Sequence, residues 1–134
     1  MPAMKKGYKA LLAEAEAQIE TLPVETALGL QGDPGVLFVD LRDPREIQRE
    51  GRIPGAFSCT RGMLEFWIDP DSPYAKQEFA EPKRFVFYCA SGWRSALATK
   101  TAQDMGLENV AHVAGGYTAW KKAGGAAEMP APRA

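Results

Sequence analysis

Cys89 lies between an aromatic, strand-like run and a helix-like run in the segment FYCASGWRSALATK, residues 87 to 100. Small residues follow it, and then a tryptophan and an arginine. A cysteine in this position could be a small core residue, a redox thiol, a phosphatase nucleophile or a sulfur carrier. Its neighbours and the elements around it help to separate these four chemistries.

The residues after Cys89 favour an anion-binding loop. Ala90, Ser91 and Gly92 are small, so the backbone can curl and direct several N–H groups inward. A nest of this kind at a helix N-terminus binds anions, and a thiolate is an anion. The helix terminus supplies up to ~2 kcal/mol, and Arg94 adds positive charge. An activated Cys89 is therefore feasible without a histidine base, although cysteines in general are more often packed as small hydrophobic residues.

The spacing between Cys89 and Arg94 separates two of the chemistries. Four residues lie between them, whereas tyrosine-phosphatase-type loops have five and form a ring large enough for a phosphate. The shorter loop favours a sulfur-sized target.

The elements around this loop alternate between strands and helices, which predicts an α/β domain with a mainly parallel sheet. Loops at the carboxyl ends of parallel strands form the natural ligand site, and Cys89 follows such a strand. The predicted strands are residues 36–41, 56–60, 84–88 and 109–113. The predicted helices are residues 4–22, 24–30 (capped by Thr21), 44–49, 63–67, 74–79, 95–105 and 117–122.

The chain is expected to divide into an N-terminal helical extension (1–22), one α/β domain (23–125) and a disordered tail (126–134). Its 134 residues fit one domain, and a net charge of −1 gives no electrostatic reason to expect nucleic acid or an anionic membrane as a partner. The charges of Glu14, Glu16 and Glu20 argue against a signal peptide or membrane span at the N-terminus, so a cytoplasmic location is expected. Two cysteines and one histidine argue against a zinc site.

Five segments in series resemble the rhodanese family, over roughly residues 21 to 125. They are VDLR (39–42) followed by Glu46, GRIPGA (51–56), RGMLEFWIDPDSPY (61–74), YCASGWRSALA (88–98) and VAHVAGGYTAW (110–120). Arg52 stands where the family motif usually has histidine, and we expect it to be solvated.

The resemblance implies a single rhodanese-like domain with sulfurtransferase activity and no cofactor. Cys89 would attack the outer sulfur of a small anionic donor such as thiosulfate, release sulfite and become a persulfide. A thiol or cyanide acceptor, or a protein acceptor, would then take the sulfur in a ping-pong scheme. The expected substrate-binding loop is Ala90, Ser91, Gly92, Trp93, Arg94 and Ser95.

Several residues outside the loop are candidates for supporting roles. A charged cluster of Asp40, Arg42 and Glu46 is expected either to hold the cysteine loop through hydrogen bonds or to be a structural ion pair. Arg61 either adds positive charge at the pocket mouth or is solvated. Cys59 is either a small core residue or a resolving thiol that pairs with Cys89 after oxidation.

Two further aromatic side chains and two rival functions are left open. Trp93 faces either the pocket mouth, where it could select donors, or the neighbouring helix. His112 is expected to be packed or partly exposed rather than catalytic.

The rivals are a non-catalytic rhodanese-fold module that binds a partner or only accepts a persulfide, and a cysteine-based phosphatase or arsenate reductase, which the short loop disfavours. The sequence leaves open the physiological donor and acceptor, the oligomeric state, and whether the N-terminal helix covers the sheet or another subunit.

Overall fold

The computed structural model describes residues 3–131, and within them five strands form one parallel sheet in the order β1-β5-β4-β2-β3. The strands are β1 (Glu20–Leu22), β2 (Val36–Asp40), β3 (Phe57–Ser58), β4 (Arg84–Tyr88) and β5 (Val110–Val113). The α-helices are α1 (Tyr8–Glu16), α2 (Val24–Leu30), α3 (Pro44–Glu50), α4 (Leu64–Ile68), α5 (Trp93–Asp104) and α6 (Gly116–Lys122), and the 3-10 turns are η1 (Arg61–Met63) and η2 (Gln77–Ala80). The predicted α/β class with a parallel sheet is confirmed.

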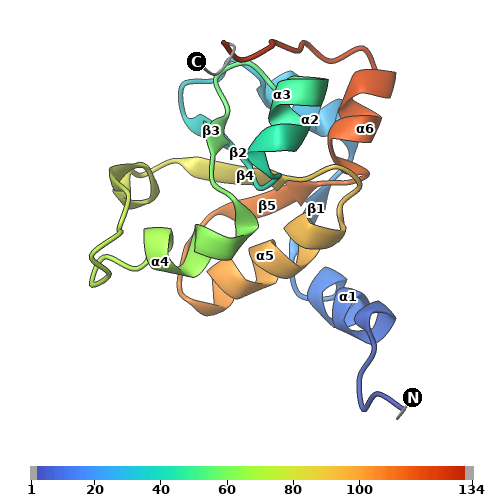
Figure 1. Ribbon diagram of the computed structural model, residues 1–134, viewed down its shortest axis with the longest axis vertical. Helices are drawn as coiled ribbons and strands as arrows, with labels where there is room; N and C mark the ends of the chain where they lie inside the picture. The colour runs from blue at the N-terminus through green and yellow to red at the C-terminus, as the bar shows by residue number, and fades with distance from the viewer. Residues whose placement is uncertain (1–2, 132–134) are drawn as a thin grey trace.

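Helices cover both faces of the sheet, with α2, α3 and α6 on one face and α4 and α5 on the other (Figure 1). The central strand β4 is apolar because it is buried on both sides. Its residues alternate between two cores: Val86 and Tyr88 belong to the core under α2 and α6, whereas Phe85 and Phe87 belong to the core over α5. Because all the strands are parallel, their carboxyl ends lie at one edge of the sheet. Cys89 follows β4 at that edge, where ligand sites of parallel sheets form.

The N-terminal segment differs from the long helix predicted for residues 4–22. Helix α1 ends at Glu16, and residues 20 to 22 form β1, which pairs in parallel with β5. Ile19 and Leu22 continue the helical spacing of apolar residues, and a three-residue strand is too short to show the opposing period of two. The predicted cap of α2 is also wrong, because Pro23 takes the N-cap position and the Thr21 hydroxyl bonds to Glu16 instead.

The segment after α6 folds back onto the domain. The backbones of Arg52 and Glu128 form an antiparallel bridge with two hydrogen bonds of 2.9 Å, and the Arg52 side chain bonds to the Glu128 carboxylate at 3.0 Å. The expectations of a solvated Arg52 and of disorder from residue 126 therefore differ from the structure as far as residue 131. Residues 132 to 134 lie outside the described part.

One smaller difference concerns a region away from the sheet. The helix predicted for residues 74–79 is a set of turns followed by η2, because the prolines and polar residues of the preceding loop favour turns over a helix. None of the helices within residues 3–131 is long and apolar enough to cross a membrane.

Candidate active site

Cys89 leaves the end of β4 and is almost completely buried, with 1% of its surface exposed. The turn that begins α6 holds it there. Cys89 O accepts a hydrogen bond from Tyr117 N at 2.8 Å, and Ala90 O accepts one from Thr118 N at 3.1 Å. Gly116 allows this approach, because a Cβ at that position would lie 2.5 Å from Cys89 O and because its φ is +60°. The paired glycines of the sequence therefore press α6 against the cysteine loop.

The sulfur atom lies at the N-terminus of α5. Cys89 Sγ accepts hydrogen bonds from Gly92 N at 3.2 Å and from Ser95 N at 3.4 Å, and it lies 3.6 Å from Ser95 Oγ. Gly92 is the N-cap of the helix and has φ 105°, which turns its N–H group toward the sulfur. Two backbone donors and a helix terminus therefore converge on one atom, an arrangement that favours a negative charge there.

Arg94 is the next charged group along the loop, and it is held by Glu46 of α3. Its two terminal nitrogens donate to the two Glu46 oxygens at 2.7 and 3.0 Å. The hydrogen bond from Arg94, together with one from Asp43 N, lowers the pKa of Glu46 from 4.5 to about 2 despite partial burial. Glu46 occupies the first turn of α3, in a capping box with Asp43. The pair therefore joins the first turns of α3 and α5.

Asp40, Arg42 and Tyr88 form a separate buried cluster, which we call the Asp40 network. Arg42 donates to both Asp40 oxygens at 2.9 and 2.7 Å and to Gly51 O at 2.7 Å. Tyr88 donates to Asp40 at 2.8 Å and accepts from Ile53 N at 3.2 Å. The network thus binds the loop after α3 to strands β2 and β4. Asp40 and Arg42 were expected to hold the cysteine loop or to be a structural ion pair, and their geometry matches the second alternative.

A second buried chain of side chains begins at the sulfur itself, and we call it the Cys89 chain. Cys89 and Ser95 are followed by His112 of β5, whose Nδ1 lies 2.9 Å from Ser95 Oγ. His112 Nε2 lies 3.0 Å from Thr21 Oγ1, and the Thr21 hydroxyl donates to Glu16 at 2.9 Å. Alternation along β5 points His112 toward α5, and the β1–β5 register places Thr21 beside it.

His112 was expected to lie packed and outside the chemistry, yet the structure places it two hydrogen bonds from the sulfur. One signal in the sequence could have identified it. A histidine within a strand whose four residues are all buried needs hydrogen-bond partners for both ring nitrogens. The loop next to Cys89 supplies one of them, and the segment that was misassigned as a helix supplies the other.

Comparisons with known proteins decide the family. The family described as Rhodanese-like domain matches residues 23–123. The chain is a member of this family. A solved structure from Rhodopseudomonas palustris CGA009, of a protein of unknown function and possible tyrosine phosphatase, is 62% identical, with a TM-score of 0.92 over 96% of this chain and 99% of that one.

Several relatives of this chain carry names that give an activity, among them a mouse protein and a yeast protein. The mouse thiosulfate sulfurtransferase/rhodanese-like domain-containing protein 3 is 29% identical over 63% of this chain. The yeast (Saccharomyces cerevisiae) thiosulfate:glutathione sulfurtransferase is 33% identical over 69% of this chain and 70% of its own length. The present chain spans only 57% of the mouse protein's length.

Cys59 belongs to the core of the rhodanese-like domain rather than to the Cys89 loop. Burial raises the pKa of its thiol from 9.0 to about 12. Ser58 and Tyr88 both pair with Asp40, so β2 lies between the two strands that the cysteines follow. Flanking strands are ~10 Å apart, and a disulfide needs Cα atoms within ~7 Å. The structure thus matches the core alternative, and a resolving role would require backbone movement.

Arg61 and Trp93 are both partly exposed, and each contacts a different neighbour. Arg61 forms an ion pair with Glu65 at 3.0 Å, so its charge is compensated locally. Trp93 is 57% exposed, and its ring centroid lies 5.0 Å from that of Tyr8 on α1. Of the predicted loop residues, Gly92 and Ser95 contact the sulfur, Arg94 braces the helix, and Trp93 packs against the N-terminal segment. Ala90 meets α6 through its carbonyl oxygen, and Ser91 is exposed.

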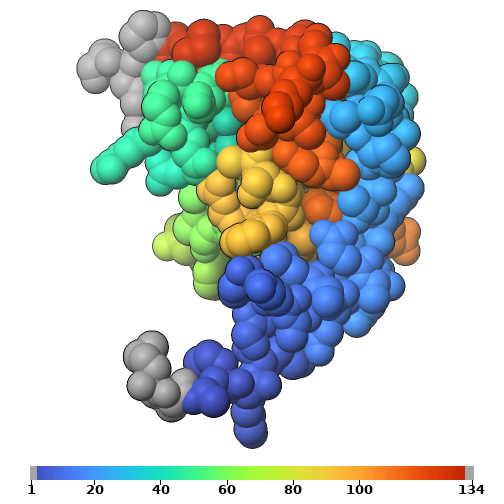
Figure 2. All heavy atoms as spheres, turned by 90° about the vertical axis from the view of Figure 1, so that its right-hand side faces the viewer, coloured from blue at the N-terminus to red at the C-terminus, as the bar shows by residue number. Residues whose placement is uncertain are grey.

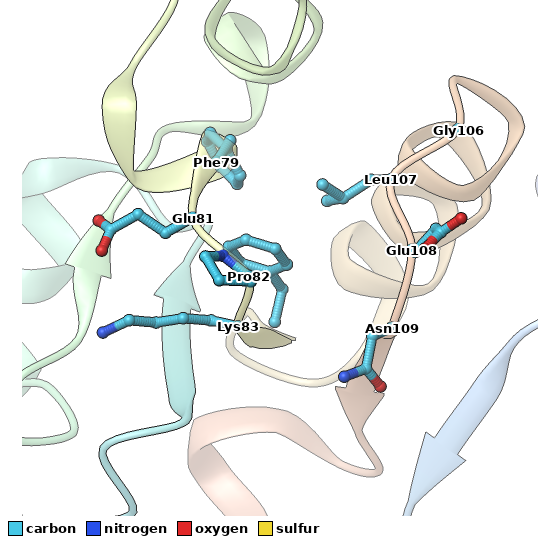
Figure 3. A pocket seen from close by; sticks show the side chains of 9 residues that line it. Phe79, Glu81, Pro82, Lys83, Gly106, Leu107, Glu108 and Asn109 are labelled. Atoms are coloured by element: carbon cyan, nitrogen blue, oxygen red, sulfur yellow. The ribbon is translucent and has the colours of Figure 1, made fainter.

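The surroundings of the loop are compact. Figure 2 shows the golden residues at the start of α5 framed by the blue N-terminal segment, the green α3 and the orange-red α6. The pocket in Figure 3 lies elsewhere, because Lys83 precedes β4 and Asn109 precedes β5. It therefore opens at the amino ends of the strands, opposite Cys89.

Proposed function

We propose that this rhodanese-like domain is a sulfurtransferase that carries sulfur as a Cys89 persulfide. The observation that carries the proposal is the position of Sγ at the N-terminus of α5, where Gly92 N and Ser95 N donate to it. Donors aimed at one atom stabilise the anion that the reaction needs, without an adjacent metal or cofactor. The names of the mouse and yeast relatives support the same class of reaction.

In the first half-reaction, the Cys89 thiolate attacks the outer sulfur of a donor, for which thiosulfate is the probe of choice. An S–S bond forms to Cys89 Sγ while the S–S bond of thiosulfate breaks, and sulfite leaves with the electron pair. The product is an anionic persulfide. The N–H groups at the start of α5 hold its charge, and the positive end of the helix adds to their effect.

In the second half-reaction, an acceptor attacks the outer sulfur of the persulfide. Cyanide would leave as thiocyanate, a small thiol would become a persulfide, and a protein thiol is a further candidate acceptor. In each case the electron pair of the broken S–S bond returns to Cys89, which becomes a thiolate again. The two half-reactions share one binding site and should follow ping-pong kinetics.

Arg94 serves this reaction as a brace that keeps a positive charge beside the loop. Glu46 raises the pKa of Arg94 by hydrogen bonding, and a charge on Cys89 raises it further. The guanidinium is therefore positive whenever an anionic donor arrives. Because both terminal nitrogens donate to Glu46, it attracts the donor by charge rather than by a second pair of hydrogen bonds.

A phosphatase is the second candidate, because the R. palustris protein is described as a possible tyrosine phosphatase. Bidentate arginine donors are the strongest phosphate ligands in proteins. In this chain Glu46 already occupies the Arg94 fork, and four residues rather than five separate Arg94 from Cys89. Both observations favour sulfur transfer over phosphate transfer.

The deciding experiment is intact mass spectrometry after incubation with thiosulfate. We expect the wild-type protein to gain the mass of one sulfur atom, and cyanide to remove it. Cys89→Ser should show no gain, and the matched variant Cys59→Ala should retain it. An adduct in Cys89→Ser, or none in the wild type, would overturn the proposal.

Two further readings of the same samples separate the rivals. Hydrolysis of an aryl phosphate that is lost in Cys89→Ser would favour the phosphatase. A carrier without enzymatic activity would take sulfur from a protein persulfide but not from thiosulfate. The sulfurtransferase should instead release sulfite in a burst equal to the enzyme concentration before cyanide is added.

A further inference from the structure

The Cys89 chain links the buried thiol to the protein surface through side chains from four secondary-structure elements. Ser95 comes from α5, His112 from β5, Thr21 from β1 and Glu16 from the end of α1. His112 is 1% exposed, whereas the Glu16 side chain is 44% exposed. The chain therefore runs from an almost sealed sulfur to a carboxylate in contact with water.

The hydrogen bonds of this chain fix the position of every proton. A carboxylate only accepts, so the single hydroxyl proton of Thr21 is donated to Glu16. Thr21 Oγ1 must then accept from His112, which places the ring proton on Nε2. The neutral imidazole therefore presents a lone pair at Nδ1, and Ser95 donates to it. Since the Ser95 proton is used in this way, Ser95 Oγ can only accept from the Cys89 thiol.

Burial and the Glu16 carboxylate act on the charge of His112 in opposite directions. Burial lowers its pKa, and Glu16 opposes that effect, so the ring is neutral in the resting state around pH 7 and gains a stabilising partner once it is charged. The groups that face it are Thr21 and Glu16 from the N-terminal segment, Ser95 from α5 and Phe87 across the sheet. Glu16 is the charged group among them. Glu20, which precedes Thr21 on β1, forms an ion pair with Arg84 at the start of β4.

We propose that His112 is the positioning base of Cys89 and that it receives the thiol proton through Ser95. The Cys89 S–H proton moves to Ser95 Oγ while the Ser95 hydroxyl proton moves to His112 Nδ1. The products are a thiolate held by Gly92 N and Ser95 N and an imidazolium whose Nε2–H faces Thr21 and Glu16. Only these O–H, S–H and N–H bonds change, and the net charge of the group stays the same, because the thiolate and the imidazolium carry opposite charges.

This inference rests on the proposed function for its purpose but not for its geometry. It assigns a role to the N-terminal segment, because Glu16 and Thr21 precede the family match at residues 23–123. The contact between the Gln103 side chain and Gln18 O, at 2.8 Å, fastens that segment to α5. The outer half of the Cys89 chain, Thr21 and Glu16, therefore lies outside the range that the family match covers.

The test measures how fast iodoacetamide alkylates Cys89 as a function of pH, with mass spectrometry to localise the label. Loss of a hydrogen-bond partner of a thiolate should slow alkylation at pH 7 about 10-fold. We expect this slowing, and a shift of the pH profile to higher pH, in Ser95→Ala and in His112→Gln. Because the two act in series, the double variant should be no slower than either single variant.

Variants of Thr21, at the outer end of the Cys89 chain, keep the proposal testable if the His112 variant does not fold. Thr21→Val should slow alkylation about 3-fold, the effect of one neutral hydrogen bond, and Thr21→Ser should restore it. Each variant is accepted only if its urea unfolding midpoint shows it folded under the assay conditions. Profiles that coincide with the wild type in folded Ser95→Ala and Thr21→Val would overturn the proposal.

A spectroscopic test uses the fact that the protein contains one histidine. Its ¹⁵N chemical shifts can be assigned without ambiguity, and we expect the neutral Nε2–H form in the resting protein. The Nδ1–H form would overturn the proposal. Neither experiment needs sulfur transfer: a shifted alkylation profile without a thiosulfate adduct would remove the proposed function alone, and an adduct with unshifted profiles would remove this inference alone.

Discussion

The Asp40 network and the Cys89 chain are two buried polar clusters at the same edge of the sheet, on opposite faces. Asp40 and Tyr88 face α2 and α6, whereas His112 faces α5. The Asp40 network is closed, since its carboxylate and guanidinium neutralise each other and their remaining hydrogen bonds go to the buried Tyr88 hydroxyl and to backbone groups. The Cys89 chain is open at both ends, at a thiol and at an exposed carboxylate. The closed cluster can only stabilise, whereas the open one can move a proton.

The largest expected effect comes from breaking the closed cluster. Arg42→Met leaves the Asp40 carboxylate buried without its partner, and such changes cost about 3–5 kcal/mol of the free energy of unfolding. We expect a loss of this size in urea or guanidinium unfolding. Removing both charges in Asp40→Leu/Arg42→Met should cost less than the single change. A single variant that loses under about 1 kcal/mol would show that the network is not structural.

The next effect comes from the turn that supports the open cluster. In Gly116→Ala the new Cβ would overlap Cys89 O, at 2.5 Å, in a backbone with positive φ. Strain of this kind costs about 1–3 kcal/mol, and displacing the loop should also slow the alkylation of Cys89.

Gly124→Ala is the matched control, because Gly124 also has a positive φ, of 83°, but nothing lies within 4 Å of the added Cβ. It should lower stability without slowing alkylation. Equal rates of Cys89 alkylation in the two variants would show that Gly116 does not position the cysteine loop.

A smaller effect concerns the brace between the two clusters, and it depends on pH. The folded-state pKa of Glu46 is about 2, below its usual 4.5. Its contribution to stability is therefore complete above about pH 4.5 and is lost as the pH falls toward 2. Wild type and Glu46→Gln should differ in unfolding midpoint at pH 6 and converge near pH 2. A difference that persists at pH 2 would contradict the assignment.

The smallest effect is expected at Cys59. Its pKa of about 12 keeps the thiol protonated and unreactive, so the native protein should take one alkyl label, at Cys89, and the unfolded protein two. A mild oxidant should not join the two cysteines within one molecule. Rapid labelling of Cys59, or an intramolecular disulfide in native protein, would place it closer to the reactive loop than the sheet register does.

The sequence predicts the strand–helix alternation and the cysteine loop well, because buried strands and the glycine-rich junction leave strong local signals. β4 has the predicted bounds, and Cys89 lies at the predicted junction. The first strand is missed because three residues carry too little periodicity to compete with a continuing helical pattern. Its pairing with β5 depends on contacts between residues about ninety positions apart, which local patterns do not contain.

The candidate site follows the same division. The backbone donors follow from the loop motif next to a helix terminus. The Glu46–Arg94 pair was not predicted, because Glu46 was grouped with Asp40 and Arg42 and its partner lies 48 positions away in the sequence. The role of His112 depends on which face of β5 it occupies and on the segment that lies beside it, so it becomes visible only once the sheet is assembled. The opposite outcome holds for Cys59, whose residue type suggests redox chemistry, whereas the register separates it from Cys89 by a whole strand.

The three-residue strand β1 also decides how this domain can be cut. It is a short edge strand, of a kind that limits pairing between molecules, and it covers the backbone of β5 from Ala111 to Val113. A truncated protein that begins at residue 23, where the family match begins, would lack β1 and would expose the unpaired backbone N–H and C=O groups of β5. It should associate edge to edge in solution, and a dimer would then be a consequence of the truncation rather than a property of the native chain.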